Sequence, residues 1–324
     1  MSSNLIEFKN LKTYFYTEAG VVKAVNDVSF KIKKGEVVGV VGESGCGKSV
    51  TAMSLMRLVD SPGKIVAGEI IYEDDKDILT LSDKEIRSIR GNEISMIFQE
   101  PMTSLNPVFT VGNQIIESIM IHKKISKKEA RKKAVEMISL VGIPDAEKVV
   151  DRYPHELSGG MRQRIMIAMA ISCNPKLLIA DEPTTALDVT IQAQILDLMR
   201  EVKKKLNTAI MLITHDLGVV AEMADYVVVM YAGKIIEEGP VDVIFKNPSH
   251  PYTIGLLKSK PILNNIKDRL YSIPGQVPSP IGMKDNCYFN ERCEACFERC
   301  TKEQPVLRLI DSNHKVACFK YEGE

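Results

Sequence analysis

The sequence predicts an α/β fold built around a parallel β-sheet, and two observations support this. Three short, almost purely apolar runs have the length and composition of buried strands, at residues 36–41, 176–180 and 209–213. Each run leads into a polar turn and then a helical pattern. Such alternation is typical of a parallel sheet, whose ligand sites lie beyond the carboxyl ends of the strands.

Elements before and between these runs follow from local patterns. Alternating apolar and polar residues predict strands over residues 5–11 and 28–32. A helix is predicted from Lys48 to about Val59, directly after a glycine-rich turn. Residues 100–156 are predicted to be mainly helical.

Two helix starts carry a capping-box pattern, in which glutamate follows serine by three residues. These are Ser82 with Glu85 and Ser126 with Glu129. Lysine and arginine are frequent between Lys123 and Lys133, but apolar residues recur there at helical spacing. The basic run is therefore expected to be the solvated face of a helix.

Length and charge limit the class of protein. The 324 residues exceed an average domain of about 150, so two domains, or one large domain with an appendage, are expected. Prolines become frequent from about residue 247, which predicts domains at residues 1–250 and 251–324. The 42 basic residues balance the 42 acidic ones, which leaves no overall charge for nucleic acid. No apolar run reaches the 18 or so residues of a membrane span, and no signal peptide is expected.

A glycine-rich segment, Gly42-Glu-Ser-Gly-Cys-Gly-Lys48-Ser49, matches the phosphate-binding pattern G-x-x-x-x-G-K-[ST] between a buried strand and a helix. Its backbone N–H groups are expected to surround phosphates, with Lys48 on the terminal phosphates and the Ser49 hydroxyl on magnesium. Cys46 is expected to fill a small loop position. The residues expected to contact the nucleotide here are Gly42, Ser44, Gly45, Cys46, Gly47, Lys48, Ser49 and Val50.

A second part of a nucleotide site is expected at Leu177-Leu-Ile-Ala-Asp181-Glu182. The apolar strand brings Asp181 to its end, where a carboxylate can hold magnesium directly or through water. Glu182 is then placed to orient or deprotonate the attacking water. An acidic pair after an apolar run is common by itself, so it indicates a nucleotide site only because the chain also contains the phosphate-binding loop.

Small residues open a predicted helix at Leu157-Ser158-Gly159-Gly160-Met-Arg-Gln163. The free N–H groups and positive dipole end of such a helix suit an anion. Since residues 42–49 already take the phosphates within this chain, a second anion-binding helix start suggests a phosphate on another subunit. An ordinary helix start capped by serine is the alternative.

These segments, in this order, resemble the ATP-binding cassette family over about residues 5–250. Ser158-Gly159-Gly160 resembles the signature motif, Gln99 the Q-loop glutamine and Asp188 the D-loop aspartate. His215 resembles the switch histidine, and Phe15 the aromatic residue that stacks on adenine. The resemblance implies a RecA-like parallel core, an antiparallel β subdomain, a helical subdomain at about 100–165 and a small cysteine-rich C-terminal module.

The family resemblance also implies an ATPase mechanism. Two cassettes would dimerise head to tail around two ATP molecules, each site combining the phosphate loop of one subunit with the signature motif of the other. Glu182, His215 and Lys48 would be the catalytic residues, with Glu182 acting on water. Magnesium would be held by Ser49, Gln99 and Asp181.

A finer resemblance is to the D-type ATPase of dipeptide and oligopeptide importers. It is carried by residues 153–164, 180–194, 214–220 and 248–257. It implies that the chain energises peptide import while it is bound at the cytoplasmic face of the membrane, beneath two permease subunits. The coupling helices of these subunits would dock between Gln99 and about Glu156. A second related ATPase or a second copy would complete the dimer, and an extracytoplasmic protein would deliver peptide. Nickel or another small solute is the alternative cargo. A soluble nucleic-acid ATPase is disfavoured by the charge and by the lack of a coiled-coil insertion.

Five of the seven cysteines lie between residues 287 and 318. The spacing Cys287-x5-Cys293-x6-Cys300-x17-Cys318 resembles the C-terminal module of the same importers, and the resemblance implies a [4Fe–4S] cluster on these four thiolates. Zinc is the alternative metal, because Cys293-x2-Cys296 is a zinc-like spacing. Unligated thiols are the third possibility, and Cys296 is not expected to be a ligand.

Overall fold

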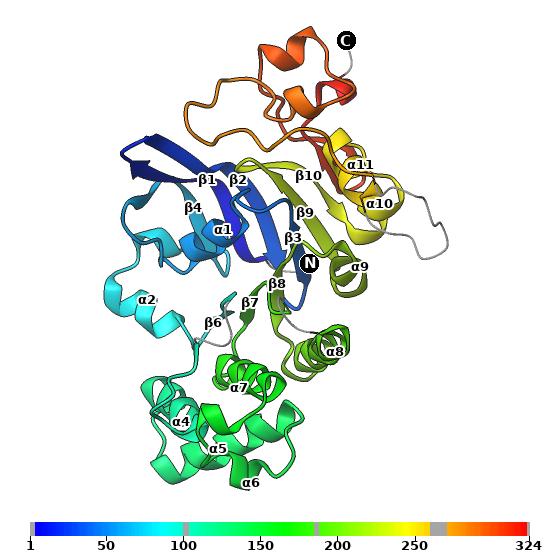
Figure 1. Ribbon diagram of the computed structural model, residues 1–324. Coiled ribbons are helices and arrows are strands. Elements are labelled where there is room, and N and C mark those ends of the chain that lie inside the picture. The colour runs from blue at the N-terminus through cyan, green and yellow to red at the C-terminus, as the bar shows by residue number, and fades with distance from the viewer. Residues whose placement is uncertain (1–3, 100–103, 185–187, 260–270, 323–324) are drawn as a thin grey trace. The chain divides into compact units, whose positions relative to one another are not determined.

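The computed structural model of the protein describes residues 4–99, 104–184, 188–259 and 271–322. These residues form two compact units, each described by itself below (Figure 1). The helical unit comprises the described residues of Met1–Leu5, Ile32–Val37 and Thr80–Ile213. The phosphate-loop unit comprises those of Ile6–Lys31, Val38–Leu79 and Thr214–Glu324.

The helical unit contains three parallel strands in the order β8-β7-β6. They are β6 (Ile94–Ile97), β7 (Leu177–Asp181) and β8 (Ala209–Ile213). Every residue of β7 and β8 is buried, as expected of central strands in a parallel sheet. Two of the three apolar runs are thereby confirmed as parallel strands.

Helices make up the rest of this unit, and α4, α5 and α7 pack against one another (Figure 1). The helices are α2 (Asp83–Ile89), α4 (Val111–His122), α5 (Lys127–Leu140), α6 (Ala146–Val149), α7 (Gly159–Ile171) and α8 (Val189–Leu206), with a 3-10 turn at Pro154–Glu156. Both predicted capping boxes are present, at Ser82 and Ser126. The mainly helical character predicted for residues 100–156 is confirmed for its described part.

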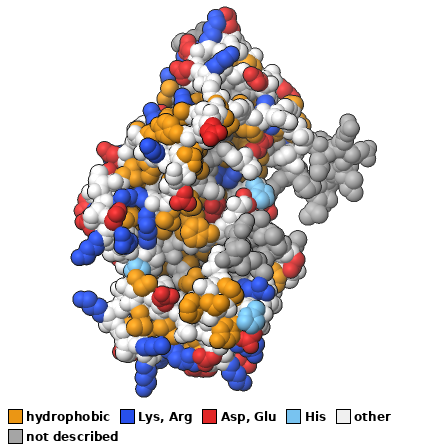
Figure 2. Space-filling model, turned by 60° about the vertical axis from the view of Figure 1, so that its left-hand side comes forward, with side chains coloured by type: hydrophobic (Ala, Val, Ile, Leu, Met, Phe, Trp, Pro, Cys, Tyr) orange, Lys and Arg blue, Asp and Glu red, His pale blue; other side chains and the backbone are white. Residues whose placement is uncertain are grey.

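Most of the basic run lies on α5, where Ala130, Ala134 and Ile138 are buried while the helix's lysines face outward. Basic side chains accordingly line the lower edge of the face seen in Figure 2. The prediction of a solvated helix face is confirmed. Among the described helices, none is both long and apolar enough to cross a membrane.

One sheet of the phosphate-loop unit has four strands in the order β2-β1-β4-β5, and β4 pairs antiparallel with both neighbours. The strands are β1 (Asn4–Thr17), β2 (Gly20–Lys33), β4 (Gly63–Tyr72) and β5 (Lys76–Asp77), and a 3-10 turn follows at Ile78–Thr80. Helix α1 (Lys48–Leu55) is joined to β1 by a buried hydrogen bond between the hydroxyls of Thr13 and Ser54 at 2.8 Å. The helix ends four residues before the predicted Val59.

The second group of strands in this unit has the order β11-β12-β10-β9-β3. The strands are β3 (Val37–Val41), β9 (Tyr226–Tyr231), β10 (Lys234–Pro240), β11 (Arg308–Asp311) and β12 (His314–Val316). β3 and β9 are parallel, whereas the pairs β9–β10, β10–β12 and β11–β12 are antiparallel, so the sheet is mixed. The C-terminal strands were not predicted, and one of them, β12, hydrogen-bonds to β10, which precedes residue 250.

Buried polar contacts reinforce this junction. The carboxylate of Glu237 on β10 accepts from His314 Nε2 on β12 at 2.8 Å. It also accepts from the N–H groups of Ser249 and His250, at 2.6 and 3.0 Å. The remaining helices are α9 (Leu217–Met223), α10 (Val241–Lys246) and α11 (Pro251–Lys258), with 3-10 turns at Asn290–Arg292, Glu298–Thr301 and Phe319–Tyr321. A separate module beginning at residue 251 stays a prediction.

Candidate functional site

The predicted phosphate-binding loop connects β3 to α1 and depends on glycines where the chain makes its closest approaches. Gly42 has φ +151°, and a Cβ there would lie 2.2 Å from the carbonyl oxygen of Met230. Gly47 has φ +100°, and its Cβ would lie 2.2 Å from the carbonyl oxygen of Ala24. Only glycine fits these positions, because side chains rarely adopt such φ values and the neighbours are backbone. The strand–turn–helix context of the motif is confirmed.

Lys48 begins α1 and is buried. Its ammonium donates to the carbonyl oxygens of Gly42 and Glu43, at 2.8 and 3.0 Å. The positive charge is therefore held inside the loop. Cys46 beside it is almost fully buried, and burial raises the pKa of its thiol, which fits a loop-filling role.

Phe15 lies near the end of β1, opposite Gly63 on β4. Alternate residues of a strand share a face, so Phe15 points to the same side as Thr13, whose hydroxyl contacts α1. Tyr14 points to the other side, where its hydroxyl donates to Asn26 at 2.9 Å. The alternation places Phe15, and neither tyrosine, on the side of the helix that follows the phosphate-binding loop.

His215 follows β8 and belongs to the phosphate-loop unit. Its side chain is exposed. The backbone around it is fixed by the N–H of Thr214, which donates to the Val40 carbonyl at 3.3 Å, and by the Asp216 side chain, which caps α9.

Asp181 and Glu182 stand at the carboxyl end of β7 in the helical unit. Asp181 is buried, whereas Glu182 is half-buried and adopts φ +47°. The N–H of Glu182 donates to the Ile213 carbonyl at 2.8 Å, which holds the residue in this unfavourable conformation. Gln99 Nε2 donates to Glu182 Oε2 at 3.1 Å. The structure thus brings together two of the predicted site residues, which are 83 positions apart in the sequence.

The signature segment opens α7. Ser158 is the N-cap residue and accepts from Met161 N–H at 3.3 Å, while Gly159 is exposed and has open space where a Cβ would stand. Behind the exposed helix start, buried Gln163 donates to the Pro183 carbonyl, two residues beyond Asp181. The helix start is therefore accessible to a ligand and joined to the acidic pair.

Asp188 caps α8, because its carboxylate accepts from Ile191 N–H at 3.0 Å. Residues 185–187, between Asp188 and the acidic pair, lie outside the described residues. The predicted magnesium ligands are divided between the units: Ser49 belongs to the phosphate-loop unit, and Gln99 and Asp181 to the helical unit. Within the described ranges, no group of three or more His, Cys, Asp or Glu side chains is arranged to hold a metal ion.

All seven cysteines lie in the described part of the chain, and all are free thiols. One small cavity is lined by the four predicted ligands together with mainly apolar residues and with His250, Asn290 and Lys320, and Cys296 is outside its lining. These four residues are Cys287, Cys293, Cys300 and Cys318. Burial, together with the smaller effect of the neighbouring thiols, raises the pKa of Cys287 to about 12. The spacing thus identified residues that converge in space.

Sequence reasoning did not predict that Arg292 contacts the phosphate-binding loop. This arginine is buried and forms a two-bond ion pair with Glu43, at 2.7 and 3.0 Å. An arginine next to a cysteine carries no signal of so distant a partner, since 249 positions separate the two residues.

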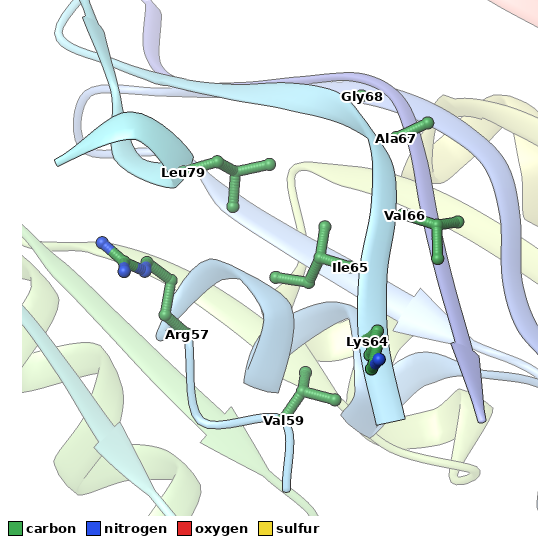
Figure 3. A pocket seen from close by; sticks show the side chains of 8 residues that line it. All are labelled: Arg57, Val59, Lys64, Ile65, Val66, Ala67, Gly68 and Leu79. Carbon is green, nitrogen blue, oxygen red and sulfur yellow. The ribbon is translucent and has the colours of Figure 1, made fainter. Parts of the chain in front are cut away.

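Another pocket, of about 450 Å³, lies along β4. Figure 3 shows Ile65 and Leu79 facing this space, with Arg57 and Lys64 also at its wall. Its lining contains none of the predicted site residues.

Comparison with known proteins extends these observations. A family model described as "ABC transporter" matches residues 25–185, and one described as "Oligopeptide/dipeptide transporter, C-terminal region" matches residues 236–300. The chain is 55% identical to the oligopeptide transport ATP-binding protein AppD of Bacillus subtilis, covering 99% of this chain and 98% of that protein. It is 48% identical to the dipeptide transport ATP-binding protein DppD of Escherichia coli, covering 97% and 96%.

Solved structures share the fold. The ATP-binding cassette MJ0796, in a dimeric post-hydrolysis state bound to ADP and phosphate, matches with a TM-score of 0.65 at 26% identity. The match covers 73% of this chain and 98% of that one. CbiO1 of Clostridium perfringens, part of an ABC transporter complex, matches with a TM-score of 0.64 at 28% identity, covering 78% and 95%.

Proposed function

This chain belongs to the ATP-binding proteins of ABC transporters, and we propose that it hydrolyses ATP to energise the import of dipeptides or oligopeptides. The match of residues 236–300 to the C-terminal region of peptide transporters carries the substrate class, because the cassette itself is common to many transporters. Full-length similarity to AppD and DppD supports the same class.

The roles proposed for the residues are those that the resemblance to ATP-binding cassettes implies. Lys48 contacts the terminal phosphates, and Phe15 stacks on the adenine. Glu182 takes the proton of the attacking water, and Gln99 orients the Glu182 carboxylate through the 3.1 Å contact. His215, exposed at the end of β8, contacts the γ-phosphate. Bound Mg²⁺ would neutralise phosphate charge, held by Ser49, Gln99 and Asp181.

We propose that the signature segment acts on ATP held by a second cassette, which is a related ATPase or another copy of this chain. Exposure of Ser158 and Gly159 at the start of a thirteen-residue helix supports this, because free N–H groups there suit an anionic ligand. The dimeric state of the structurally similar MJ0796 is in line with it.

Docking of two permease subunits is proposed on the helical unit, with an extracytoplasmic peptide-binding protein delivering cargo. A mainly apolar groove of about 390 Å³ lies beside the Q-loop glutamine, lined by Met96, Phe98, Met166 and Met169 among others. Phe98 is 41% exposed, Phe109 52% and Ile121 70%. Figure 2 shows hydrophobic side chains gathered over this lower, helical part of the face in view. Such a surface fits an apolar helix of a membrane subunit, and so a peripheral location at the cytoplasmic face of the membrane.

For the four convergent cysteines we propose metal binding, with a [4Fe–4S] cluster as the expected group and zinc as the alternative. The four thiols line one cavity, which supports their role as the metal ligands. In the described residues these thiols are not yet arranged around a metal ion. The raised thiol pKa values mean that ligation has to displace protons. Anaerobic purification followed by iron, sulfide and zinc analysis tests this, and metal-free protein that retains its full stability would refute it.

Reconstitution tests the whole function. The chain, its permease subunits and its partner ATPase in proteoliposomes should take up peptide only with ATP and the binding protein present. Uptake of Ni²⁺ but not of peptide would reject the proposed cargo while leaving the ATPase assignment intact.

A further inference from the structure

An arginine from the C-terminal segment reaches into the phosphate-binding loop. Arg292 ends the 3-10 turn Asn290–Arg292, and its Nη1 and Nη2 donate to the two carboxylate oxygens of Glu43 at 2.7 and 3.0 Å. Its Nε donates to the Pro274 carbonyl at 2.9 Å. A guanidinium bound on both sides in this way is fixed in position, and lysine cannot reproduce the arrangement.

Glu43 is held at three separate points. Its N–H donates to the Tyr252 hydroxyl at 2.9 Å, its carbonyl accepts from Lys48 Nζ at 3.0 Å, and its carboxylate binds Arg292. Glu43 is the residue after Gly42, so its orientation directs the following N–H groups of the loop. The C-terminal segment is thereby part of the support of the phosphate-binding loop.

Charge gives the contact a second consequence. An unpaired carboxylate one residue inside a phosphate-binding loop would repel the phosphates, and the Glu43 side chain is 27% exposed. Arg292 neutralises that carboxylate from the protein interior, because the arginine side chain is only 6% exposed.

Packing joins the pair to its surroundings. The ring of Phe289 lies 5.3 Å from that of Tyr231 and 5.5 Å from that of Tyr252, both edge-on. Arg292 Nη1 is also 3.3 Å from the Tyr231 hydroxyl. Residues 287–293 are therefore connected to Glu43 through Arg292 and to its backbone through Tyr252.

We propose that Arg292 is a positioning residue of the nucleotide site, which neutralises and orients Glu43 so that the C-terminal segment sets the affinity of the loop for nucleoside triphosphates. This rests on the proposed ATPase function and is independent of the cargo. Arg292 itself contacts the loop and not the reacting atoms.

The test measures Mg-ATP binding to the purified full-length chain by calorimetry for wild type, Arg292→Ala, Glu43→Gln and the double variant. We expect Arg292→Ala to weaken binding about tenfold, because it leaves the carboxylate unpaired. Glu43→Gln should cost less than about threefold, and in the double variant it should restore most of the affinity lost with Arg292. The maximal ATPase rate at saturating ATP should change less than about threefold, so the effect lies mainly in KM.

Arg299→Ala is the matched control. Arg299 lies in the same segment, pairs with Glu303 and Glu322 at 2.9 Å and stacks on Phe319, and these three partners all lie within the C-terminal segment. Its loss should lower stability without changing ATP affinity. Equal losses of affinity in Arg299→Ala and Arg292→Ala, or no rescue in the double variant, would overturn the proposal in favour of a purely structural role.

Hydrogen exchange supplies a readout that does not depend on activity. By reciprocity, Mg-ATP should slow amide exchange in residues 287–293 of wild type, and this protection should be lost in Arg292→Ala. Glu43→Gln covers the case in which Arg292→Ala fails to fold, since it should reduce the same protection. If wild type binds ATP but shows no such protection, the role of Arg292 is refuted and the ATPase assignment stands. If wild type binds no ATP, both the role of Arg292 and the ATPase assignment are refuted.

Discussion

Glu182→Gln separates ATP binding from ATP hydrolysis most directly. The substitution keeps the size of the side chain and removes its charge and its capacity to take a proton. Its amide oxygen can still accept from Gln99 Nε2, and the backbone bond from residue 182 to the Ile213 carbonyl is unaffected. The geometry of this part of the site should therefore survive, and ATP affinity should change by less than about threefold.

The expected loss is in the chemical step. A positioned general base contributes about 10²–10⁴-fold, so turnover should fall by that factor, which corresponds to about 3–5 kcal/mol in the activation free energy. Glu182→Asp should retain more activity than Glu182→Gln, because it keeps a carboxylate that is displaced by one methylene. Phosphate release gives the rate, and calorimetry gives the affinity.

Glu93→Gln is a suitable control. Glu93 adjoins the opposite end of β7, where its carbonyl accepts from Leu177 N–H and its carboxylate pairs with Lys176 at 3.0 Å. This change should leave the ATPase rate unaltered, because the pair is partly exposed and remote from the end of β7 that carries Glu182. ATPase activity of Glu182→Gln within threefold of wild type would refute the general-base role.

Three further outcomes are expected. Glu237→Ala leaves two buried N–H groups and His314 without their acceptor, so urea denaturation should show a loss of about 3–5 kcal/mol in the free energy of unfolding. Glu69→Ala is the control, because Glu69 forms an exposed pair with Lys9, and it should cost less than about 1 kcal/mol. Burial lowers the pKa of His250 to about 3, below its unfolded value of about 6.5. As pH falls, the imidazole is therefore protonated in the unfolded chain before it is protonated in the folded one, and the folded state loses stability. Between pH 7 and 5.5 the free energy of unfolding should drop by about 1 kcal/mol more in wild type than in His250→Asn, which retains an acceptor for the Tyr252 N–H. An equal dependence of stability on pH in the two proteins would contradict this. Phe15→Ala should weaken ATP binding by about 1–3 kcal/mol and leave phosphate-only ligands unaffected, while Tyr16→Ala, on the other face of β1, should bind ATP normally.

Local patterns were the most predictable part of this protein. Both capping boxes, the buried strands and the phosphate-binding loop follow from residues within about ten positions of one another, where steric and hydrogen-bonding rules act directly. The end of α1 was predicted less well, because the chain turns at Met56 with no proline or glycine to mark it. The C-terminal strands were missed because β11 and β12 are only four and three residues long and show little alternation.

The sequence by itself determined which chemical groups this chain carries: a glycine-rich loop of the phosphate-binding pattern, an acidic pair, a helix start of small residues and a set of four thiols. Motif residues are informative because each must be of one chemical type to act at all. Only the tertiary structure decided which distant residues touch, namely Gln99 with Glu182, Glu237 with His314 and Glu43 with Arg292. Such pairs depend on which segments the folded chain brings together. An arginine in the sequence looks the same whether its side chain contacts water or a carboxylate 249 positions away.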